Sequence, residues 1–463
     1  MKRWTLTIWV LALIASLTVG LIGCSSQTAT PSPTAASTKK ESAPTEKPAS
    51  PATPKAGEPK TSDTASKPSG QPIVLGVPTA LGTIEGADSL RAVQLAVEEI
   101  NAKGGVSVGG VKRPFEVVSI DTREAEAGTP TNDALAATEK LITEKKPNAI
   151  VVGAFRSEVF LASMDLIAKY KLPYITSIAM TPEFEKKMQA EPEKYKYFFR
   201  TGLNAPYLVG NLIKVMEFTG KKFSFKKVYF INQDVAWAKG TSDALEKWAK
   251  ANGWEVVGHD AYPTGSSDFS SSLNKAKSGG AQLVVPIFDM PQSGVLVKQA
   301  KSVKLQALIA GFISPAAPGT AWKAFDGEVA GLVNFLFENG SMPVKAVPKS
   351  VAFVENYGKK YGEEQKQKLS GHGPGPAYDS VYVLAAAIEK AGSVDADAVV
   401  SALEKTDTDG VIGKIKFNKD HQVIYGTNPK ETAISTAFQW KAPGVRVPVF
   451  PEAAAEAEIE LTK

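Results

Sequence analysis

The residues best suited to chemistry are few and widely spaced in this sequence. The chain of 463 residues has three histidines, His259, His372 and His421, and one cysteine, Cys24. Catalytic and metal sites need such side chains to converge, and the sequence has no nucleophile elbow, phosphate-binding glycine loop or clustered metal ligands. We interpret His372, in its Gly/Pro-rich loop, as structural. We therefore expect no enzyme, no cofactor and no metal.

The single cysteine follows a segment typical of membrane targeting. Residues 1–3 are Met-Lys-Arg and residues 4–23 form an apolar run. Residues 21–24 (LIGC) resemble the lipobox of bacterial lipoproteins, which implies that residues 1–23 are a signal peptide and that Cys24 carries lipid. Several acyl chains anchor a protein firmly in a bilayer. The expected location is the cell membrane, lipid-anchored and facing the extracellular or periplasmic side; the alternative is an uncleaved signal anchor with an incidental Cys24.

Residues 24–71 contain Ser, Thr, Ala, Pro and Lys with almost no large apolar side chain. Such a composition buries too little surface to fold. Because Pro-rich spacers stay extended, we expect a disordered tether that could hold a domain on the order of 100 Å from the bilayer. The alternative is a filler without mechanical role.

Charge in the remaining sequence is balanced. The first 71 residues hold eight Lys/Arg and four Asp/Glu, which leaves 45 basic and 44 acidic residues in the rest of the chain. Nucleic-acid binding requires a concentrated basic surface. The sequence therefore argues against a nucleic-acid partner.

From Ile73 onward, short apolar runs alternate with amphipathic stretches, which predicts βαβ units and parallel sheets. Residues 73–77 form the first predicted strand, and Asp88 is a candidate N-cap for the next helix. Residues 149–152 are apolar throughout, as expected for a strand covered by helices on both faces. The pattern restarts near Tyr197. We therefore predict an α/β protein with two Rossmann-like lobes and a crevice beyond the carboxyl ends of their strands.

Two stretches near the start of this region stand out: residues 76–82 (GVPTALG) and residues 95–105 (LAVEEINAKGG). They resemble the opening of type I periplasmic binding proteins, the branched-chain amino acid and amide-binding family. Further stretches also resemble this family and occur in the same order along the chain. The resemblance spans about residues 72–442. These stretches are residues 173–176, 199–201, 268–270, 378–380 and 385–392.

The resemblance implies two lobes joined by a three-strand hinge, so each lobe combines two pieces of chain. We place lobe 1 at residues 72–200 and 337–407, lobe 2 at residues 201–336 and 408–442, and a C-terminal tail at residues 443–463. The family's fold implies that the lobes close over a ligand about the hinge.

The resemblance also implies a function. Members of this family bind a small polar solute such as an amino acid, an amide or a related carboxylate, and deliver it to the permease of an ABC importer. We expect a monomer. The alternative is a ligand sensor of the same fold that signals through a membrane partner.

By position, the resemblance implies ligand contacts from three loops of lobe 1. The second loop precedes a predicted helix, whose N-terminus attracts anions. In the third loop, Ile178 and Met180 replace side chains that could hold a carboxylate or an ammonium group. The loops contribute Thr79, Ala80, Phe155, Arg156, Ser157, Ser177 and Ala179.

Two of these residues have alternative interpretations. Arg156 suits a carboxylate because its guanidinium can donate two parallel hydrogen bonds; alternatively, it pairs with Glu158 on the surface. Ser157 is either a ligand contact or a simple N-cap.

Lobe 2 contributes two candidates. Trp237 corresponds to an aromatic residue that often faces the ligand in the family, and it could instead belong to the core. Asp289 follows an apolar strand at residues 283–288, where a side chain faces the crevice; the alternative is an exposed loop acid. Amino-acid binders carry an acid after the next strand, where this chain has residues 311–314 (GFIS). Asp289 is a candidate to take over that role.

Overall fold

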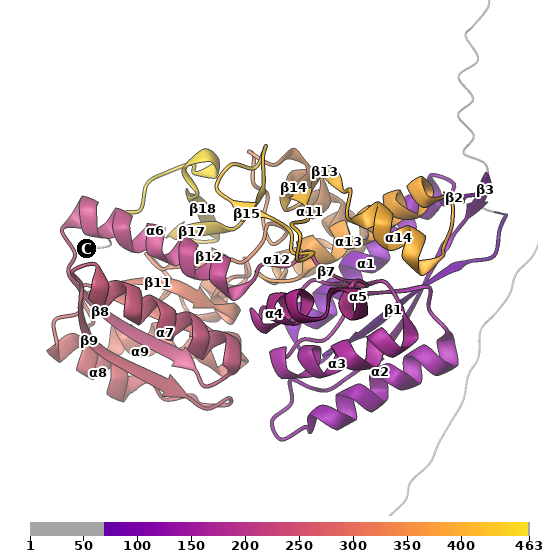
Figure 1. Ribbon diagram of the computed structural model, residues 1–463. Coiled ribbons are helices and arrows are strands. Elements are labelled where there is room, and N and C mark those ends of the chain that lie inside the picture. Colours follow the sequence, from indigo (N-terminus) through magenta and orange to yellow (C-terminus); the bar gives the residue numbers. More distant parts are fainter. Residues whose placement is uncertain (1–68, 462–463) are drawn as a thin grey trace, which may run out of the picture. The chain divides into compact units, whose positions relative to one another are not determined.

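The computed structural model describes residues 69–461, shown as a ribbon in Figure 1. The signal peptide, Cys24 and nearly all of the expected tether lie outside the described residues. Within the described part, no helix combines the length and apolarity required to cross a bilayer.

The first sheet consists of five parallel strands in the order β4-β1-β5-β6-β7. Ile150 and Val151 show why β5 is apolar throughout, because successive side chains point to opposite faces of a sheet. Val151 packs with α1 and α13, whereas Ile150 packs with α2 and α3. The strands are β4 (Phe115–Asp121), β1 (Ile73–Thr79), β5 (Ala149–Val152), β6 (Tyr174–Thr176) and β7 (Phe198–Arg200).

Helices from two separate parts of the sequence surround this sheet, as the colours of Figure 1 show. The earlier group is α1 (Ile84–Ala102), α2 (Thr131–Lys145), α3 (Ser157–Tyr170), α4 (Glu183–Ala190) and α5 (Pro192–Tyr195). The later group is α11 (Pro348–Tyr361), α12 (Glu363–Gln367), α13 (Pro374–Ala391) and α14 (Ala396–Leu403).

The second sheet has seven strands in the order β18-β17-β12-β11-β10-β8-β9. Five are parallel, and β17 and β18 add an antiparallel edge. The strands are β8 (Lys227–Gln233), β9 (Glu255–Tyr262), β10 (Leu283–Phe288), β11 (Leu308–Ile313), β12 (Val333–Leu336), β17 (Thr436–Ala442) and β18 (Val445–Phe450). Its helical elements are α6 (Ala205–Phe223), α7 (Ala236–Ala251), α8 (Ser270–Ser278), η1 (Pro291–Gly294), α9 (Val295–Ser302), η2 (Ser314–Ala316), α10 (Ala321–Ala324) and η3 (Glu452–Ala454).

Two parallel-dominated sheets confirm the predicted α/β class. The chain leaves the first sheet after Arg200, and β12 of the second sheet ends at Leu336. A further small sheet, ordered β13-β14-β16-β15, then precedes β17. Its strands are β13 (Asp407–Gly410), β14 (Gly413–Lys416), β15 (Tyr425–Gly426) and β16 (Ala433–Ile434), and β2 (Val106–Val108) with β3 (Val111–Arg113) forms a hairpin. The lobe limits within residues 72–442 remain a proposal.

Two sequence predictions are wrong. Helix α1 begins at Ile84, and the Thr83 hydroxyl accepts a hydrogen bond from the Gly86 amide at 3.0 Å, so Asp88 is not the N-cap. Residues 443–463 are not merely a tail, because they contain β18, which pairs with β17. Pro448 obscured this strand; proline is tolerated there because β18 lies at the edge of the sheet.

A buried arginine fixes the place where the chain leaves the first sheet. Arg200 is fully buried; its guanidinium forms an ion pair with Glu185 and donates to the Thr181 carbonyl at 2.8 Å. Its backbone amide donates to the His421 carbonyl at 2.9 Å, which ties β7 to the segment that follows β14. Arg200 therefore joins stretches of chain that lie far apart in the sequence.

We expect Arg200→Ala to lower the free energy of unfolding by about 3–5 kcal/mol, because removing one partner strands the other charge in a buried site. Chemical denaturation measures the difference. Arg123→Ala is the control: Arg123 pairs with Glu126, both are exposed, and we expect little change. Equal effects of the two substitutions would contradict this role of Arg200.

Candidate functional site

A small cavity lies where residues that follow strands of both sheets meet. Its volume is about 20 Å³, which is room for about one water molecule. Its walls include residues that follow β5, β6, β10 and β12 and the second residue of α7. The lining residues are Phe155, Ser157, Ile178, Met180, Trp237, Asp289, Phe337 and His372.

The structure brings together five of the nine predicted residues, from elements of both sheets. Phe155, Ser157, Trp237 and Asp289 line the cavity, and Arg156 contacts Asp289. Parallel strands point their carboxyl ends to the same edge of a sheet, which explains why loops so distant in sequence converge here. The role of these residues in ligand binding remains a proposal.

Asp289 is the centre of a polar contact between elements of the two sheets. The Arg156 guanidinium donates to the Asp289 carboxylate at 3.4 Å, and the Trp237 indole N–H donates to the same oxygen at 2.9 Å. The Arg156 and Asp289 side chains are 9% and 10% exposed. Asp289 is therefore not an exposed loop acid, and the ion pair of Arg156 is with Asp289 rather than with Glu158.

The N-terminus of α3 already holds an anion. The Glu124 carboxylate, which is buried, accepts hydrogen bonds from the Phe155 and Arg156 amides at 2.9 Å each. Burial raises the pKa of Glu124, although these hydrogen bonds oppose the shift. Arg156 occupies the N-cap position, so the interpretation of Ser157 as N-cap is wrong.

Five predicted residues do not line the cavity: Arg156, which contacts Asp289 beside it, and Thr79, Ala80, Ser177 and Ala179. The Ala80 carbonyl accepts a hydrogen bond from the Thr83 hydroxyl at 2.9 Å, and the Ala179 carbonyl accepts one from Arg200 at 3.3 Å. The hydroxyls of Thr79 and Ser177 are buried and have no hydrogen-bond partner among residues 69–461. A buried polar group without a hydrogen bond costs free energy. These hydroxyls would therefore gain from a hydrogen bond to a further partner.

Four lining residues were not predicted as site residues. Ile178 and Met180 were set aside because they cannot hold a charged group, yet they form apolar walls. Phe337 directly follows β12, and this position at a carboxyl strand end was the signal that could have found it. His372, which we interpreted as structural, lies where a loop of the first lobe meets the cavity.

His372 forms a buried ion pair beside the cavity. Its Nδ1 lies 3.0 Å from the Glu338 carboxylate and its Nε2 donates to the Ile178 carbonyl at 2.9 Å. Burial lowers the pKa of His372, but the Glu338 carboxylate, together with Glu85 and the Ile178 carbonyl, outweighs burial and the net pKa is raised. With an acceptor at each ring nitrogen, we assign His372 as an imidazolium whose charge is balanced by Glu338.

A second carboxyl group connects the two sheets. The Ser314 hydroxyl, which follows β11, donates to the Glu85 carboxyl in the first turn of α1 at 2.5 Å. Glu85 is 2% exposed. Burial raises the pKa of Glu85 from 4.5 to about 7. Glu85 is therefore largely protonated in mildly acidic solution.

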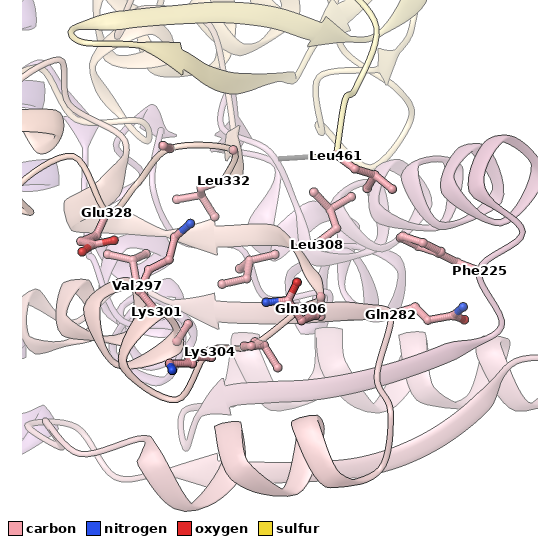
Figure 2. A pocket seen from close by; sticks show the side chains of 16 residues that line it. Phe225, Gln282, Val297, Lys301, Lys304, Gln306, Leu308, Glu328, Leu332 and Leu461 are labelled. Atoms are coloured by element: carbon pink, nitrogen blue, oxygen red, sulfur yellow. The ribbon is translucent and has the colours of Figure 1, made fainter. Parts of the chain in front are cut away.

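A larger hollow of about 530 Å³ lies elsewhere in the second sheet's lobe (Figure 2). Gln282, Leu308 and Leu332 line it at the amino ends of β10, β11 and β12, and Lys301 and Leu461 contribute to its walls. Open parallel sheets bind ligands at the opposite, carboxyl edge. None of the predicted site residues lines this hollow.

One group among the described residues has the composition of a metal site. Ligand atoms of Asp243, Glu246 and His259 lie within 4.8 Å of one another. The His259 ring nitrogens are already hydrogen-bonded, Nδ1 with Glu246 at 2.5 Å and Nε2 with Asn232 at 2.7 Å. Hydrogen bonds within the protein thus account for this group.

Comparisons with known proteins agree with this geometry. The model of the periplasmic binding protein family matches residues 74–428. Leu/Ile/Val-binding protein homolog 8 of Brucella abortus (strain 2308) is 27% identical over 389 residues, covering 82% of this chain and 89% of the relative.

Two solved structures share the fold. The substrate-binding protein LivJ of a branched-chain amino acid transporter from Streptococcus pneumoniae, in complex with isoleucine, has a TM-score of 0.64 and 22% identity, covering 81% of this chain and 97% of that one. A solute-binding protein of an ABC transporter from R. palustris, in complex with benzoate, has a TM-score of 0.65 and 17% identity, covering 84% and 98%. With its two parallel sheets and the family match over most of its described residues, this chain belongs to the periplasmic binding protein family, a family of solute-binding proteins.

Proposed function

We propose that this protein is the extracytoplasmic substrate-binding lipoprotein of an ABC importer. It encloses a small polar solute between its two lobes and delivers the solute to the permease. The observation that carries the proposal is the cavity, because its walls come from both lobes and combine aromatic side chains with Asp289, which forms an ion pair with Arg156. The names of the relatives support an amino acid, an amide or a related carboxylate as the solute.

The walls of the cavity suit a solute with an apolar part. Met180, Trp237 and Phe337 supply apolar surface, and Asp289 and Ser157 supply polar groups. Ligand sites of binding proteins are mostly apolar with a few placed polar groups that fix orientation. The Thr79 and Ser177 hydroxyls are further candidate donors if a solute approaches them.

Entry of a solute requires movement. A cavity of about 20 Å³ is far smaller than a ligand pocket, which has a volume of several hundred Å³. Because Arg156 and Asp289 come from different lobes, their contact must open before a solute can enter. Hinge motion between lobes supplies such an opening in two-lobed proteins.

Attachment to the membrane would keep the protein near its permease. We propose that Cys24 carries the lipid and that residues 24–71 form the tether of a monomer. Two anchoring acyl chains give stable membrane binding, and an extended tether allows the lobes to search for the permease.

Mass spectrometry of small molecules that copurify with the protein tests the binding function. We expect a solute that, added back to the stripped protein, raises the melting temperature. Uptake of that solute should fall in a deletion strain. Undiminished uptake would contradict delivery to a permease and favour a sensor. If a screen of amino acids, amides, aromatic acids and short peptides gave no melting shift, binding itself would be rejected.

We expect Trp237→Ala to weaken affinity for the copurified solute about tenfold or more, because a large aromatic contact is lost, on the order of 1–3 kcal/mol. Isothermal titration measures the change. Trp248→Ala, on the same helix but outside the cavity lining, is the control. An unchanged dissociation constant for Trp237→Ala would show that this side chain packs in the core and does not contact the solute.

Glu85 gives a prediction for pH. Its pKa is raised to about 7 in the folded protein. A raised pKa gives stability that is fully present below the unfolded value of 4.5 and is lost as the pH rises through about 7. Glu85→Gln cannot ionise at this position. As the pH rises from 4.5 to 7, the free energy of unfolding of the wild type should therefore fall relative to that of the variant, by on the order of 3 kcal/mol. Melting temperatures of both proteins across this range test the effect; parallel pH profiles would contradict it.

A further inference from the structure

We infer that Glu85 and Ser314 form a pH-sensitive latch between the two lobes, which holds the lobes closed while Glu85 carries a proton and releases them when Glu85 ionises. This inference rests on the proposed function, because it assumes lobes that open and close about a hinge. Closure then takes up a proton. Acidic surroundings therefore favour capture of a solute, and neutral or alkaline surroundings favour its release.

The two groups of the latch come from elements of different sheets. Glu85 lies in the first turn of α1, which packs against the first sheet. Ser314 begins η2, directly after β11 of the second sheet. The Ser314 hydroxyl donates to the Glu85 carboxyl at 2.5 Å, and the two residues are 1% and 2% exposed. Because donor and acceptor belong to different lobes, separation of the lobes breaks this hydrogen bond and lets water reach the carboxyl.

In the closed form an ionised Glu85 would lack a cation of its own. The nearby His372 ring, in the loop before α13, is already paired with Glu338 at 3.0 Å. The Asp289 carboxylate, which follows β10, repels a further negative charge at this place. Taking an unpaired carboxylate out of water is strongly unfavourable, so a buried carboxyl without a counter-ion binds a proton instead. The geometry therefore favours the neutral acid in the closed form.

The titration of Glu85 agrees with this geometry. Burial raises the pKa of Glu85 from 4.5 to about 7, although the Ser314 hydroxyl, the amide of Glu85 itself and His372 oppose the shift. In an open form water would hydrate the carboxyl, and its pKa would return towards 4.5. The stabilisation of the closed form is thus fully present below the open-form pKa and is lost as the pH rises through about 7.

Other polar contacts between the lobes do not respond to pH in this way. Arg156 pairs with Asp289, and an arginine side chain stays charged in this pH range. The Thr320 amide, just before α10, donates to the Gln367 carbonyl at the end of α12 at 3.2 Å, and a backbone hydrogen bond does not titrate. Glu85 is therefore the group in these contacts that can make closure depend on pH.

Distance measurements between two spin labels by pulsed electron paramagnetic resonance test the latch on the full chain, without any added solute. The labels are attached through Lys140→Cys in α2 and Lys247→Cys in α7, which replace exposed residues of the two lobes, in a chain that also carries Cys24→Ser. We expect a short distance at about pH 5 and a longer one to appear at about pH 8.5. With pKa values of 4.5 and about 7, the ratio of closed to open molecules should fall roughly 50- to 100-fold.

Variants that cannot ionise at this position sharpen the test. Glu85→Gln and the similarly long, apolar Glu85→Met should both keep the short distance at the higher pH. Two replacements are used, with circular dichroism as the check on folding, so that a folding defect in one leaves the other to decide. Glu98→Gln is the control, because Glu98 lies on the same helix, its side chain is 64% exposed and it pairs with Lys360. This variant should open with rising pH as the wild type does.

The outcomes separate the latch from the proposed function. Wild-type distances that stay the same from pH 5 to 8.5 would overturn the latch. A pH response that persists in both Glu85 variants would also overturn it, because another group such as His372 would then be responsible. Neither result affects the binding function, which the copurified solute tests at a single pH. Conversely, a failure to find any bound solute leaves the label distances, and thus the test of the latch, unchanged.

Discussion

Charges that leave water must be paired, and this constraint organises the region between the two sheets. Arg200 is fully buried and pairs with Glu185 where the chain leaves the first sheet. Glu338 pairs with His372 beside the cavity. Because one partner of a buried pair cannot be removed without stranding the other, these contacts fix which segments can lie together. Arg156 and Asp289 differ, since their contact is long and a charged solute could replace it.

The sequence alone predicted the fold well, because its physical signals are local. The apolar strand at residues 149–152 could be recognised from its composition, and alternating side-chain direction places Ile150 and Val151 in different cores. The start of α1 was missed because its N-cap is Thr83, five residues before Asp88. The edge strand β18 was missed because Pro448 argues against a strand unless the strand lies at an edge, and edge position is a property of the whole sheet.

The site was predictable in part. Residues at carboxyl strand ends, such as Asp289, follow from topology, and family resemblance supplied Trp237 and Ser157. The contact of Arg156 with Asp289 could not be predicted, because it joins residues from two lobes and depends on how the lobes meet. The same holds for Glu124. Its carboxylate accepts hydrogen bonds from the backbone amides at the start of α3, so the helix N-terminus is already occupied beside the Arg156 side chain. Pairings across the interface depend on tertiary packing, which no local pattern encodes.

We propose that a solute enters between the lobes and is enclosed by the residues that line the small cavity. A crystal structure of the protein with its copurified solute tests this claim most directly. We expect polar atoms of the solute within hydrogen-bond distance of Asp289 and apolar atoms against Trp237. A solute seated in the hollow of Figure 2, or one bound while Arg156 and Asp289 still contact each other, would contradict the claim.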